Sequence, residues 1–499
     1  MKTKFLEIFP GALAWLTLLI LISLSFVKPV WVAIFIILFD CYWLCKTAFL
    51  YFHLQAGFRQ MRANQKVNWV NELINNQQLA TGNWRNIYHL IILPTYKEPY
   101  EVVRESFLSL KNANYPKDKL IVVLAIEEKA GVAAETIVQK IKGEFEKDFF
   151  KFLVSRHPAD LAGEIAGKGA NETWAVKEAK KTIIDPLKIN YENILVSAFD
   201  IDTQSGSDYF GILTYKFLTV KKPQRSSYQP VPLFTNNIYQ APALARLIAF
   251  STTFWMMMHQ SWSERLTTFS SHSMPFKALV EIGFWETGVV SEDSRIFWQF
   301  FLHYKGDWRV VPLFYPVYMD ANVAPSFWRT LKNLYKQQRR WAWGAENIPY
   351  VLSGFSAAGI SLGQKIYRGF HLVEDFHSWA TNALIIFIFG WLPVLVGGAN
   401  FSISLLSYNL PRVTSFIMTI ASIGIITSAV LALSLLPPKP NKFKIRHYIF
   451  YLAQWALMPV TLIVMGSFPA LEAQTRLMFG KRFYLDFWAT PKSRSKTAG

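Results

Sequence analysis

Cysteine is scarce in this sequence, with two residues among 499. Both, Cys41 and Cys45, lie inside an apolar run, so they provide neither a disulfide framework nor the ligand spacing of a zinc site. Internal repeats and low-complexity segments are missing, and so is a Lys/Arg block that resembles a nucleic-acid-binding arm. We therefore expect the bulk of the chain to face a reducing compartment and to bind no nucleic acid.

Acidic residues are also few relative to basic ones, 34 against 52, which gives a net charge of +18. Such a surplus suits anionic lipid or a phosphorylated substrate as well as nucleic acid. The basic residues cluster beside apolar segments, 52% of the residues are apolar, and the mean hydropathy is positive. These features predict a membrane component, with the charge serving lipid contact and topology.

The chain begins with two apolar runs, at about 10–27 and 30–52, separated only by Lys28 and Pro29. Each run approaches the roughly 20 residues that a bilayer core requires, so residues 1–52 are predicted to form a transmembrane hairpin. A cleaved signal peptide is not expected, because no small-residue cleavage site precedes the second run. Basic residues on both outer flanks place these flanks in the cytoplasm: Lys2, Lys4, Arg59, Arg62 and Lys66.

Residues 53–345 are more polar and carry short β-rich runs at 89–93, 120–126 and 193–199, which alternate with helix-like stretches such as 172–181. This alternation predicts an α/β domain with a mostly parallel, twisted sheet, inserted between transmembrane helices. Ligands of such sheets bind beyond the carboxyl ends of the strands. The residues that follow the three runs are therefore the first candidates for a functional site.

After interfacial helices expected at 346–378, three apolar runs follow at about 379–398, 414–436 and 448–468. Three complete spans after a cytoplasmic domain would leave the C-terminus outside. However, the four basic residues within 439–446 and the six within 476–496 indicate a cytoplasmic link and a cytoplasmic interfacial tail over 471–499. Because Pro459 and Pro469 interrupt and end the last run, we interpret it as re-entrant or interfacial within a 379–470 membrane region.

Asp200 and Asp202 follow the apolar strand ILVSAF as a D-x-D pair. Mg²⁺ and Mn²⁺ prefer hard oxygen ligands, and Mg²⁺ is usually bound through one or two carboxylates plus substrate phosphates. The pair is therefore predicted to hold a nucleotide diphosphate through a divalent metal. The alternative is a solvated turn after a buried strand.

Two further motifs carry groups suited to catalysis. In Ser291-Glu292-Asp293, the aspartate is either a cap at the start of the helix-like run 294–304 or a general base for an acceptor hydroxyl. The motif Q-Q-R-R-W at 337–341 is either part of a membrane-surface helix or a substrate-binding element. In the second case Arg340 would neutralise a departing pyrophosphate while Trp341 stacks on a sugar ring, and both readings can hold together.

Five motifs occur in a characteristic order: P-T-Y-K-E at 94–98, G-K-G-A-N at 167–171, D-I-D, S-E-D and Q-Q-R-R-W. Over about residues 85–345 and the flanking spans, this order resembles the family 2 inverting glycosyltransferases of GT-A type. The most similar branch is the processive one that contains cellulose, chitin and hyaluronan synthases. The most specific part of the resemblance is Q-Q-R-R-W following S-E-D.

The resemblance implies a role for each matching residue. Asp200 and Asp202 match the pair that binds the metal and the donor, with Asp202 as the direct ligand. Asp293 matches the catalytic base, and Glu292 in the same motif is counted as catalytic. Donor-binding roles fall on Thr95, Tyr96 and Glu98 of the first-strand loop, on Lys168 and Asn171, and on Gln337, Arg340 and Trp341.

Three other segments compare less closely with this family. Near the C-terminus, F-W-A-T-P-K at 487–492 resembles the gating loop F-x-V-T-x-K of cellulose synthases, which adds Thr490 and Lys492 to the donor-binding residues. The run 269–273 stands where the synthases have an acceptor-lining segment, although its residues differ. Glu127 replaces the aspartate that reads the nucleobase, and we expect it to accept a hydrogen bond from a uracil-like edge.

These observations predict a multi-pass enzyme of the inner or plasma membrane with a cytoplasmic catalytic domain. It would use Mg²⁺ or Mn²⁺ and a nucleotide-sugar, most simply UDP-linked, to extend a saccharide in polysaccharide synthesis. Two alternatives remain: transfer of one sugar to a lipid-linked acceptor, and a catalytically idle partner of a polysaccharide exporter. The idle partner predicts damaged motifs, whereas all five are intact. Self-association and an export partner both remain open.

Overall fold

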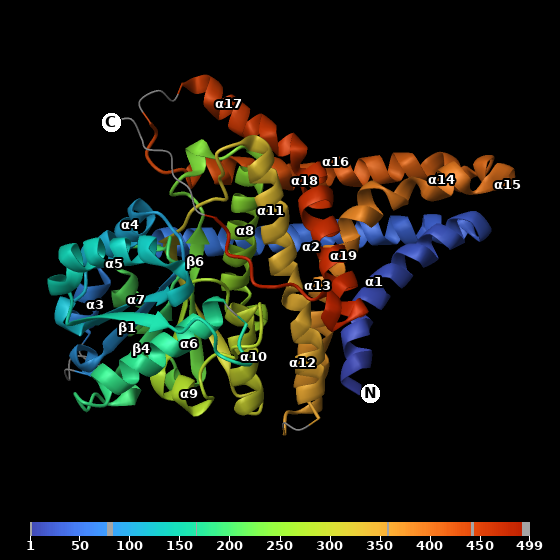
Figure 1. The fold of residues 1–499 in the computed structure, drawn as a ribbon. Helices are drawn as coiled ribbons and strands as arrows, with labels where there is room; N and C mark the ends of the chain where they lie inside the picture. The colour runs from blue at the N-terminus through green and yellow to red at the C-terminus, as the bar shows by residue number, and fades with distance from the viewer. Residues whose placement is uncertain (1, 77–82, 166, 357–358, 441–443, 492–499) are drawn as a thin grey trace.

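The computed structural model describes residues 2–76, 83–165, 167–356, 359–440 and 444–491. An α/β half and a helical arm make up the molecule, and several helices lie between them (Figure 1). Lys492, which the sequence assigns to the donor site, falls outside the described residues.

The sheet has eight strands in the order β3-β2-β1-β4-β7-β6-β8-β5. The three strands expected from the apolar runs are present as β1 (Tyr88–Thr95), β2 (Leu120–Glu127) and β4 (Ile194–Ala198). Together with β3 (Lys151–His157), they form the parallel part of the sheet. Nearly all residues of β1, β2 and β4 are buried, as is usual for parallel strands covered on both faces.

The described sheet is mostly parallel, as predicted, because six of its eight strands run in one direction, but it is mixed and not purely parallel. Strand β7 (His272–Pro275) is antiparallel to β4 and to β6 (Ser226–Leu233), and β5 (Gln204–Ser205) is antiparallel to β8 (Arg309–Tyr318). Strands β6 and β8 are parallel to each other. The sequence H-S-M-P of β7 has no apolar run to reveal it, and a hydrophobic pattern does not encode strand direction.

The two faces of the sheet bury different residues of the same strand. Leu90 and Ile92 of β1 pack in a core with α6 (Lys168–Ala179), whereas Ile91 and Leu93 pack in a second core with α4 (Tyr100–Lys111). This alternation follows from the two-residue period of a strand. It fixes the direction in which each strand end presents its polar residues.

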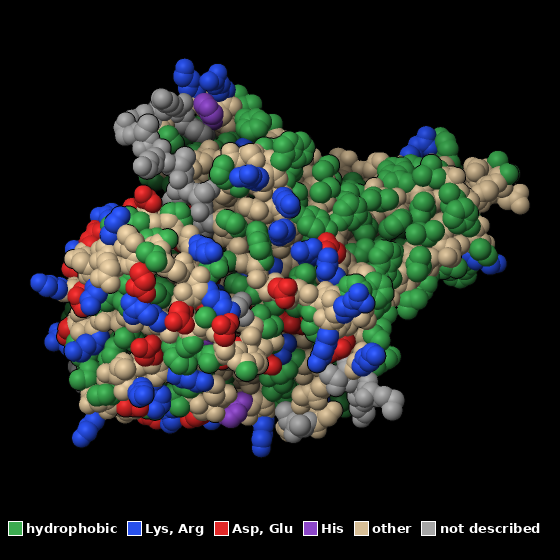
Figure 2. All heavy atoms as spheres, in the orientation of Figure 1, with side chains coloured by type: hydrophobic (Ala, Val, Ile, Leu, Met, Phe, Trp, Pro, Cys, Tyr) green, Lys and Arg blue, Asp and Glu red, His purple; other side chains and the backbone are tan. Residues whose placement is uncertain are grey.

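In the part of the chain that the structure describes, four helical segments are long and apolar enough to cross a membrane: 4–27, 29–64, 405–434 and 445–479. The first three correspond to α1 (Lys2–Val27), α2 (Pro29–Asn64) and α16 (Leu405–Ser434), which project together into the arm (Figure 1). Figure 2 shows the side of this arm covered by hydrophobic side chains, whereas basic and acidic side chains intermingle over the α/β half. The length and composition of these helices are consistent with a membrane protein.

The run predicted as a span at 379–398 is bent in the structure. Helix α13 (Leu362–Phe387) ends inside it, and the chain turns by 45° into 389–396, which includes α14 (Leu392–Val396). The last segment comprises α17 (Ile445–Ala453), α18 (Met458–Thr461) and α19 (Phe468–Phe479), joined by short 3₁₀ and π turns. Pro459 and Pro469 lie in the first turns of α18 and α19, where a missing N–H costs little.

Residues 445–479 run across α2 and α16 instead of alongside them (Figure 1). Glu472 of this segment accepts hydrogen bonds from Tyr335 (2.8 Å) and Arg339 (2.5 Å) of α11 (Phe327–Ala342). Gln474 donates to the carbonyl of Phe376 in α13 at 2.8 Å. Although the segment is long enough to span, these contacts place it beside the helices that adjoin the α/β half.

Candidate functional site

One cavity of about 1060 Å³ lies at the carboxyl ends of β1, β2 and β4 and continues between the helices of the arm. It is lined from the sheet side by the ends of these strands and by α6, α10 (Glu292–His303) and α11, and from the other side by α2, α8 (Ala243–Ser261), α13 and α16. Every described residue that the sequence assigns to the site lines this cavity: Thr95, Tyr96, Glu98, Glu127, Lys168, Asn171, Asp200, Asp202, Glu292, Asp293, Gln337, Arg340, Trp341 and Thr490.

Lys168 is the central cation of the sheet side. Its Nζ lies 2.8 Å from Asp200 Oδ1 and 2.8 Å from Asp293 Oδ1, and 3.7 Å from Glu172 Oε1. Burial opposes the charge of Lys168, but the carboxylates of Asp200 and Asp293 outweigh burial and raise the pKa of this lysine well above its ordinary value. The lysine is therefore an ammonium ion that joins the D-x-D motif to the S-E-D motif.

Asp200 and Asp202 have different surroundings. Asp202 is fully buried, and its Oδ2 accepts a hydrogen bond from the backbone N–H of Asp320 at 2.9 Å. The side chain of Asp200 is 30% exposed and also accepts a 2.6 Å hydrogen bond from Ser270 Oγ. Ser270 has a positive φ of 47°, a conformation that aims this loop residue at the D-x-D motif.

The donor chemistry of this pair fits a divalent ion, because both carboxylates line the same cavity. Within the described ranges, however, there is no group of three or more His, Cys, Asp or Glu side chains arranged to hold a metal. The two carboxylates alone would therefore not complete a coordination sphere. Phosphate oxygens of a substrate are the groups that the pair would require.

Glu292 and Asp293 begin α10, but their carboxyl groups face different environments. Asp293 is 23% exposed and bound to Lys168, and the N-terminus of the helix shows no side-chain capping hydrogen bond. The capping interpretation therefore does not account for Asp293. Glu292 is buried, and burial together with the negative charge of Asp293 raises the pKa of Glu292 to about 8.

The Q-Q-R-R-W motif forms the last turns of α11. Trp341 packs edge-on against Phe269 at 5.5 Å between ring centroids, and Gln337 accepts a hydrogen bond from Asn322. The Arg340 guanidinium lies 5.2 Å from the ring of Phe487 in the C-terminal tail. The motif thus packs as an interfacial helix on one side and lines the cavity on the other.

The tail also closes against the loop that precedes Lys168. A Cβ added to Gly167 would lie 2.8 Å from the ring of Phe487, so glycine permits this close approach. Phe487, Ala489 and Thr490 line the cavity, and Thr490 is buried. The gating-loop-like segment therefore lies over the sheet side of the site as far as it is described.

Two predicted nucleotide-binding residues also hold the local backbone. Glu98 Oε2 accepts hydrogen bonds from Thr95 Oγ1 (2.8 Å) and from the N–H groups of Tyr96 (2.7 Å) and Lys97 (3.1 Å), which folds the loop after β1. Asn171 Nδ2 donates to the carbonyl of Ala125 at 3.1 Å and so fixes α6 to β2. These contacts position the walls of the cavity, whatever else the two side chains bind.

Sequence reasoning missed several residues of the site. His157, the last residue of β3, lies between Glu127 Oε2 (3.0 Å) and Glu164 Oε2 (2.9 Å). Glu172 is fully buried one helical turn after Lys168, and burial raises the pKa of its carboxyl group well above the ordinary range. The D-x-D and S-E-D patterns contain no signal for these residues. Only the proximity of Glu172 to G-K-G-A-N at helical spacing could have indicated it.

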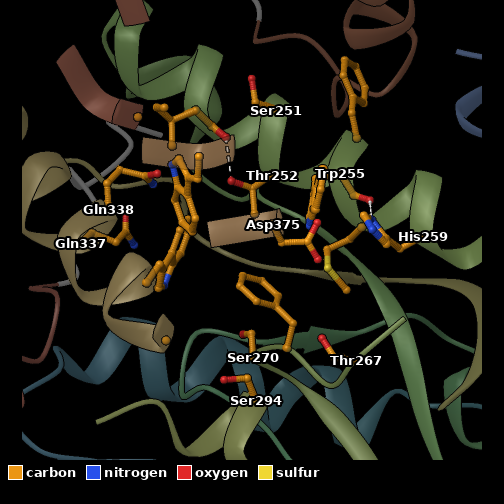
Figure 3. Close-up of a pocket in the computed structure, with 18 of the residues that line it drawn as sticks. Ser251, Thr252, Trp255, His259, Thr267, Ser270, Ser294, Gln337, Gln338 and Asp375 are labelled. Atoms are coloured by element: carbon orange, nitrogen blue, oxygen red, sulfur yellow. Dashed lines mark hydrogen bonds between the residues drawn. The ribbon is translucent and has the colours of Figure 1, made fainter. Parts of the chain in front are cut away.

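The far side of the cavity has a polar and aromatic lining. Figure 3 shows Ser251, Thr252, Trp255 and His259 from α8 around the same space as Asp375 from α13 and Gln337 and Gln338 from α11. Deeper between the helices, Lys46 of α2 forms an ion pair with Glu374 at 2.5 Å. Asp40 and Lys46 were overlooked in the sequence because they stand inside an otherwise apolar run.

Comparison with known proteins gives one family match. Residues 200–468 match the family model described as glycosyl transferase family group 2. The solved structures that resemble the chain include mannosyltransferase PcManGT from Pyrobaculum calidifontis in complex with GDP-Man and Mn²⁺, with 14% identity, 83% of this chain and 97% of that chain covered, and a TM-score of 0.39. Another is TarS 1–349 from S. aureus in complex with UDP-GlcNAc, with 13% identity, 79% and 91% covered, and a TM-score of 0.36. No curated protein matches the chain in sequence.

Proposed function

The chain belongs to glycosyl transferase family group 2, and from this premise we propose that it is a membrane-bound inverting enzyme that moves a sugar from a metal-bound nucleotide-sugar to a saccharide. The observation that carries the proposal is the bridge from Asp200 through Lys168 to Asp293, with 2.8 Å on each side. It joins a diphosphate-binding motif to a candidate base at one point of the cavity. The α/β half is the GT-A-like domain of this enzyme.

The donor diphosphate would occupy the sheet side of the cavity. Asp200 and Asp202 would hold a divalent cation, which supplies positive charge to the diphosphate when bound. Lys168 and Arg340 line the same cavity and add two cationic side chains that neutralise charge on the leaving group. Thr95, Tyr96 and Glu127 lie at the ends of β1 and β2, where the nucleoside would bind.

The transfer itself is a single displacement. An acceptor hydroxyl attacks the anomeric carbon from the face opposite the diphosphate, the new C–O bond forms as the bond to the diphosphate breaks, and Asp293 takes the hydroxyl proton. Glu292 is unsuited to this step, because a carboxyl group with a pKa near 8 keeps its proton at neutral pH. We therefore assign the base to Asp293 alone and give Glu292 a supporting role as a neutral acid.

The acceptor would enter from the side of the arm. Hydroxyl, amide and carboxyl groups alternate there with indole rings, a mixture that suits the polar edges and apolar faces of sugar rings (Figure 3). A cavity that continues between α2 and α16 offers room for sugars added earlier, which favours polysaccharide synthesis. Transfer of one sugar to a lipid-linked acceptor would use only the end nearest Asp293.

The proposed orientation follows from the crossing of residues 445–479 over α2 and α16. If this segment lies at the membrane surface, the chain crosses the membrane four times, through α1, α2, the bent 362–396 region and α16. It then ends on the side of the membrane on which it begins. The α/β half and the tail then share the cytoplasmic face of the inner or plasma membrane, as the basic flanks require. Phe487 to Thr490 would close over the donor and exclude water.

The proposal is tested with purified protein in lipid nanodiscs and a panel of radiolabelled nucleotide-sugars with Mg²⁺ or Mn²⁺. Wild-type protein should transfer one of these sugars, and chelation of the metal should stop the transfer. A long product supports polysaccharide synthesis, whereas a lipid that carries one sugar supports the alternative acceptor. Absence of transfer from every donor, with saccharide and lipid acceptors supplied, would overturn the enzyme assignment.

A further inference from the structure

A histidine between two carboxylates lies behind Glu127, which lines the donor end of the cavity. His157 Nδ1 lies 3.0 Å from Glu127 Oε2, and His157 Nε2 lies 2.9 Å from Glu164 Oε2. Glu127 and His157 are direct neighbours in the parallel pairing of β2 with β3. Their side chains are 12% and 5% exposed, so the contact is sheltered from solvent and its geometry is set by the sheet.

Hydrogen bonding restricts what this arrangement can do. An ionised carboxylate only accepts hydrogen bonds, so the ring nitrogen that meets an ionised Glu127 donates to it. Burial raises the pKa of Glu127, while the charge and the hydrogen bond of His157 work against that rise. His157 therefore favours Glu127 as an acceptor, and it engages one of the two carboxylate oxygens, Oε2.

The other oxygen of Glu127 is the one that a ligand can use. Glu127 lines the cavity together with Tyr96 and Lys129, and no described residue donates a hydrogen bond to its Oε1. Uracil presents one imide N–H between two carbonyl groups, a pattern that one carboxylate oxygen satisfies. Guanine presents two adjacent N–H donors and needs both oxygens of a carboxylate, whereas adenine and cytosine present a ring-nitrogen lone pair that a carboxylate repels.

We propose that His157 is a positioning residue: it holds Oε2 of Glu127, the residue already expected to read the nucleobase, so that Oε1 meets the single imide N–H of a uracil base. This inference rests on the proposed function and adds His157 to its base-reading end. Glu164 completes the arrangement by holding the second ring nitrogen of His157. Because Glu164 stands four residues before Lys168, and Ile165 N–H donates to the Thr287 carbonyl at 2.9 Å, the base-reading end is tied to the loop that leads to the diphosphate.

The chain offers variants that separate this role from folding. His157→Asn places an amide nitrogen near the position of Nδ1 and keeps a donor for Glu127, whereas His157→Leu keeps bulk without any donor. Glu135→Gln is the matched control, because Glu135 pairs with Arg156, the neighbour of His157 on β3, in an exposed contact outside the cavity.

Binding of UDP and of GDP to the purified full-length protein with Mn²⁺ is measured by titration calorimetry. Wild type and Glu135→Gln should bind UDP more tightly than GDP by roughly tenfold or more, since each lost hydrogen bond to a charged group costs about that factor. His157→Leu should weaken the binding of UDP by roughly tenfold and leave the binding of GDP nearly unchanged, so the preference for UDP should be lost. His157→Asn should retain most of the preference.

Equal binding of UDP and GDP by wild type would overturn the inference, as would an unchanged preference in His157→Leu. Equal losses in the Leu and Asn variants would show that His157 acts through folding and would also overturn it. Failure of the proposed function would give a different result: the wild-type protein would then bind neither UDP nor GDP and would transfer no sugar.

Discussion

Lys168 and Asp293 are joined by a hydrogen bond of 2.8 Å, although 125 residues separate them in the chain. One residue begins α6 and the other lies in the first turn of α10, so the pair depends on how these helices meet at the edge of the sheet. The ammonium of Lys168 holds one oxygen of Asp293 without removing its exposure to the cavity. This arrangement fixes the position of the Asp293 carboxyl group and leaves it facing the cavity.

The first prediction separates binding from chemistry at Asp293. Asp293→Asn keeps the shape and the hydrogen bond to Lys168 but removes basicity, so nucleotide affinity should survive while turnover falls by about 10² to 10⁴. Nucleotide binding and initial rate are measured on the same preparation. Near-normal turnover would remove Asp293 from the catalytic residues and leave it as an acidic residue in the first turn of α10.

The second prediction concerns the metal pair. Asp202→Asn keeps an acceptor for the N–H of Asp320 and so spares the buried packing, but it removes a charge from the metal site. We expect it to abolish turnover and to weaken nucleotide diphosphate binding in Mn²⁺ more than Asp200→Asn does. With the metal chelated, both variants should bind like wild type. If Asp202→Asn kept full metal-dependent binding of the nucleotide diphosphate, the D-x-D motif would be only a turn after β4.

The third prediction follows from the raised pKa of Glu292. The folded state keeps the Glu292 proton up to about pH 8, whereas an unfolded chain releases it near the ordinary value of 4.5. Between these pH values the unfolded state binds fewer protons than the folded state. The contribution of Glu292 to the free energy of unfolding therefore falls as the pH rises from 4.5 to about 8. The glutamine side chain of Glu292→Gln cannot ionise. The melting temperature of this variant minus that of wild type should therefore increase as the pH rises from 4.5 to about 8.

The same variant also distinguishes the roles of the two neighbouring carboxyl groups. Glu292→Gln should retain turnover at pH 7, because a neutral amide replaces a neutral acid. The exposed Glu101→Gln is the control, and its melting temperature should follow that of wild type at every pH. A loss of turnover as large as that of Asp293→Asn would instead place Glu292 in the chemistry.

Much of the α/β half could be predicted because its central strands are continuous apolar runs. Residues 89–93, 120–126 and 193–199 became β1, β2 and β4 of the sheet, and the acids that follow them line the cavity. Strand β7 could not be predicted in the same way. Its residues His272 and Ser273 are polar, and they are buried because neighbouring strands supply the pairing.

The sequence motifs predicted the residues of the site but not how these residues are arranged in space. The motifs point to Lys168, Asp200 and Asp293 separately, yet only tertiary structure places one ammonium between the two carboxylates. His157 contacts Glu127 through strand pairing, which has no local pattern. The bend at Phe387 was missed for another reason: the apolar run continues through it, so hydropathy alone cannot locate the break.

The fourth prediction tests the orientation of the tail. In a background in which Cys41 and Cys45 are replaced by serine, a cysteine at Ser495 should react with a membrane-impermeant reagent only after the cells are opened. This follows from the basic residues of 476–496, which favour the cytoplasm. Labelling in intact cells would refute the cytoplasmic tail and, with it, the closure over the donor.

The last prediction concerns the contact between Gly167 and Phe487. Gly167 has an extended backbone with φ of −177°, which any residue can adopt, so Gly167→Ala should add no backbone strain. Its methyl group would instead meet the Phe487 ring at 2.8 Å and displace the tail. If the tail excludes water from the donor, this displacement should raise hydrolysis of the nucleotide-sugar relative to transfer.

A double-mutant cycle distinguishes this mechanism from a defect at Lys168, the neighbour of Gly167. Phe487→Ala should raise hydrolysis by itself, and Gly167→Ala should add little to it, because the ring that the methyl group would meet is gone. Phe483→Ala provides the control, since Phe483 lies on the same tail but does not line the cavity. Additive effects of Gly167→Ala and Phe487→Ala would mean that the two residues act independently, and the tail would then have no closing role.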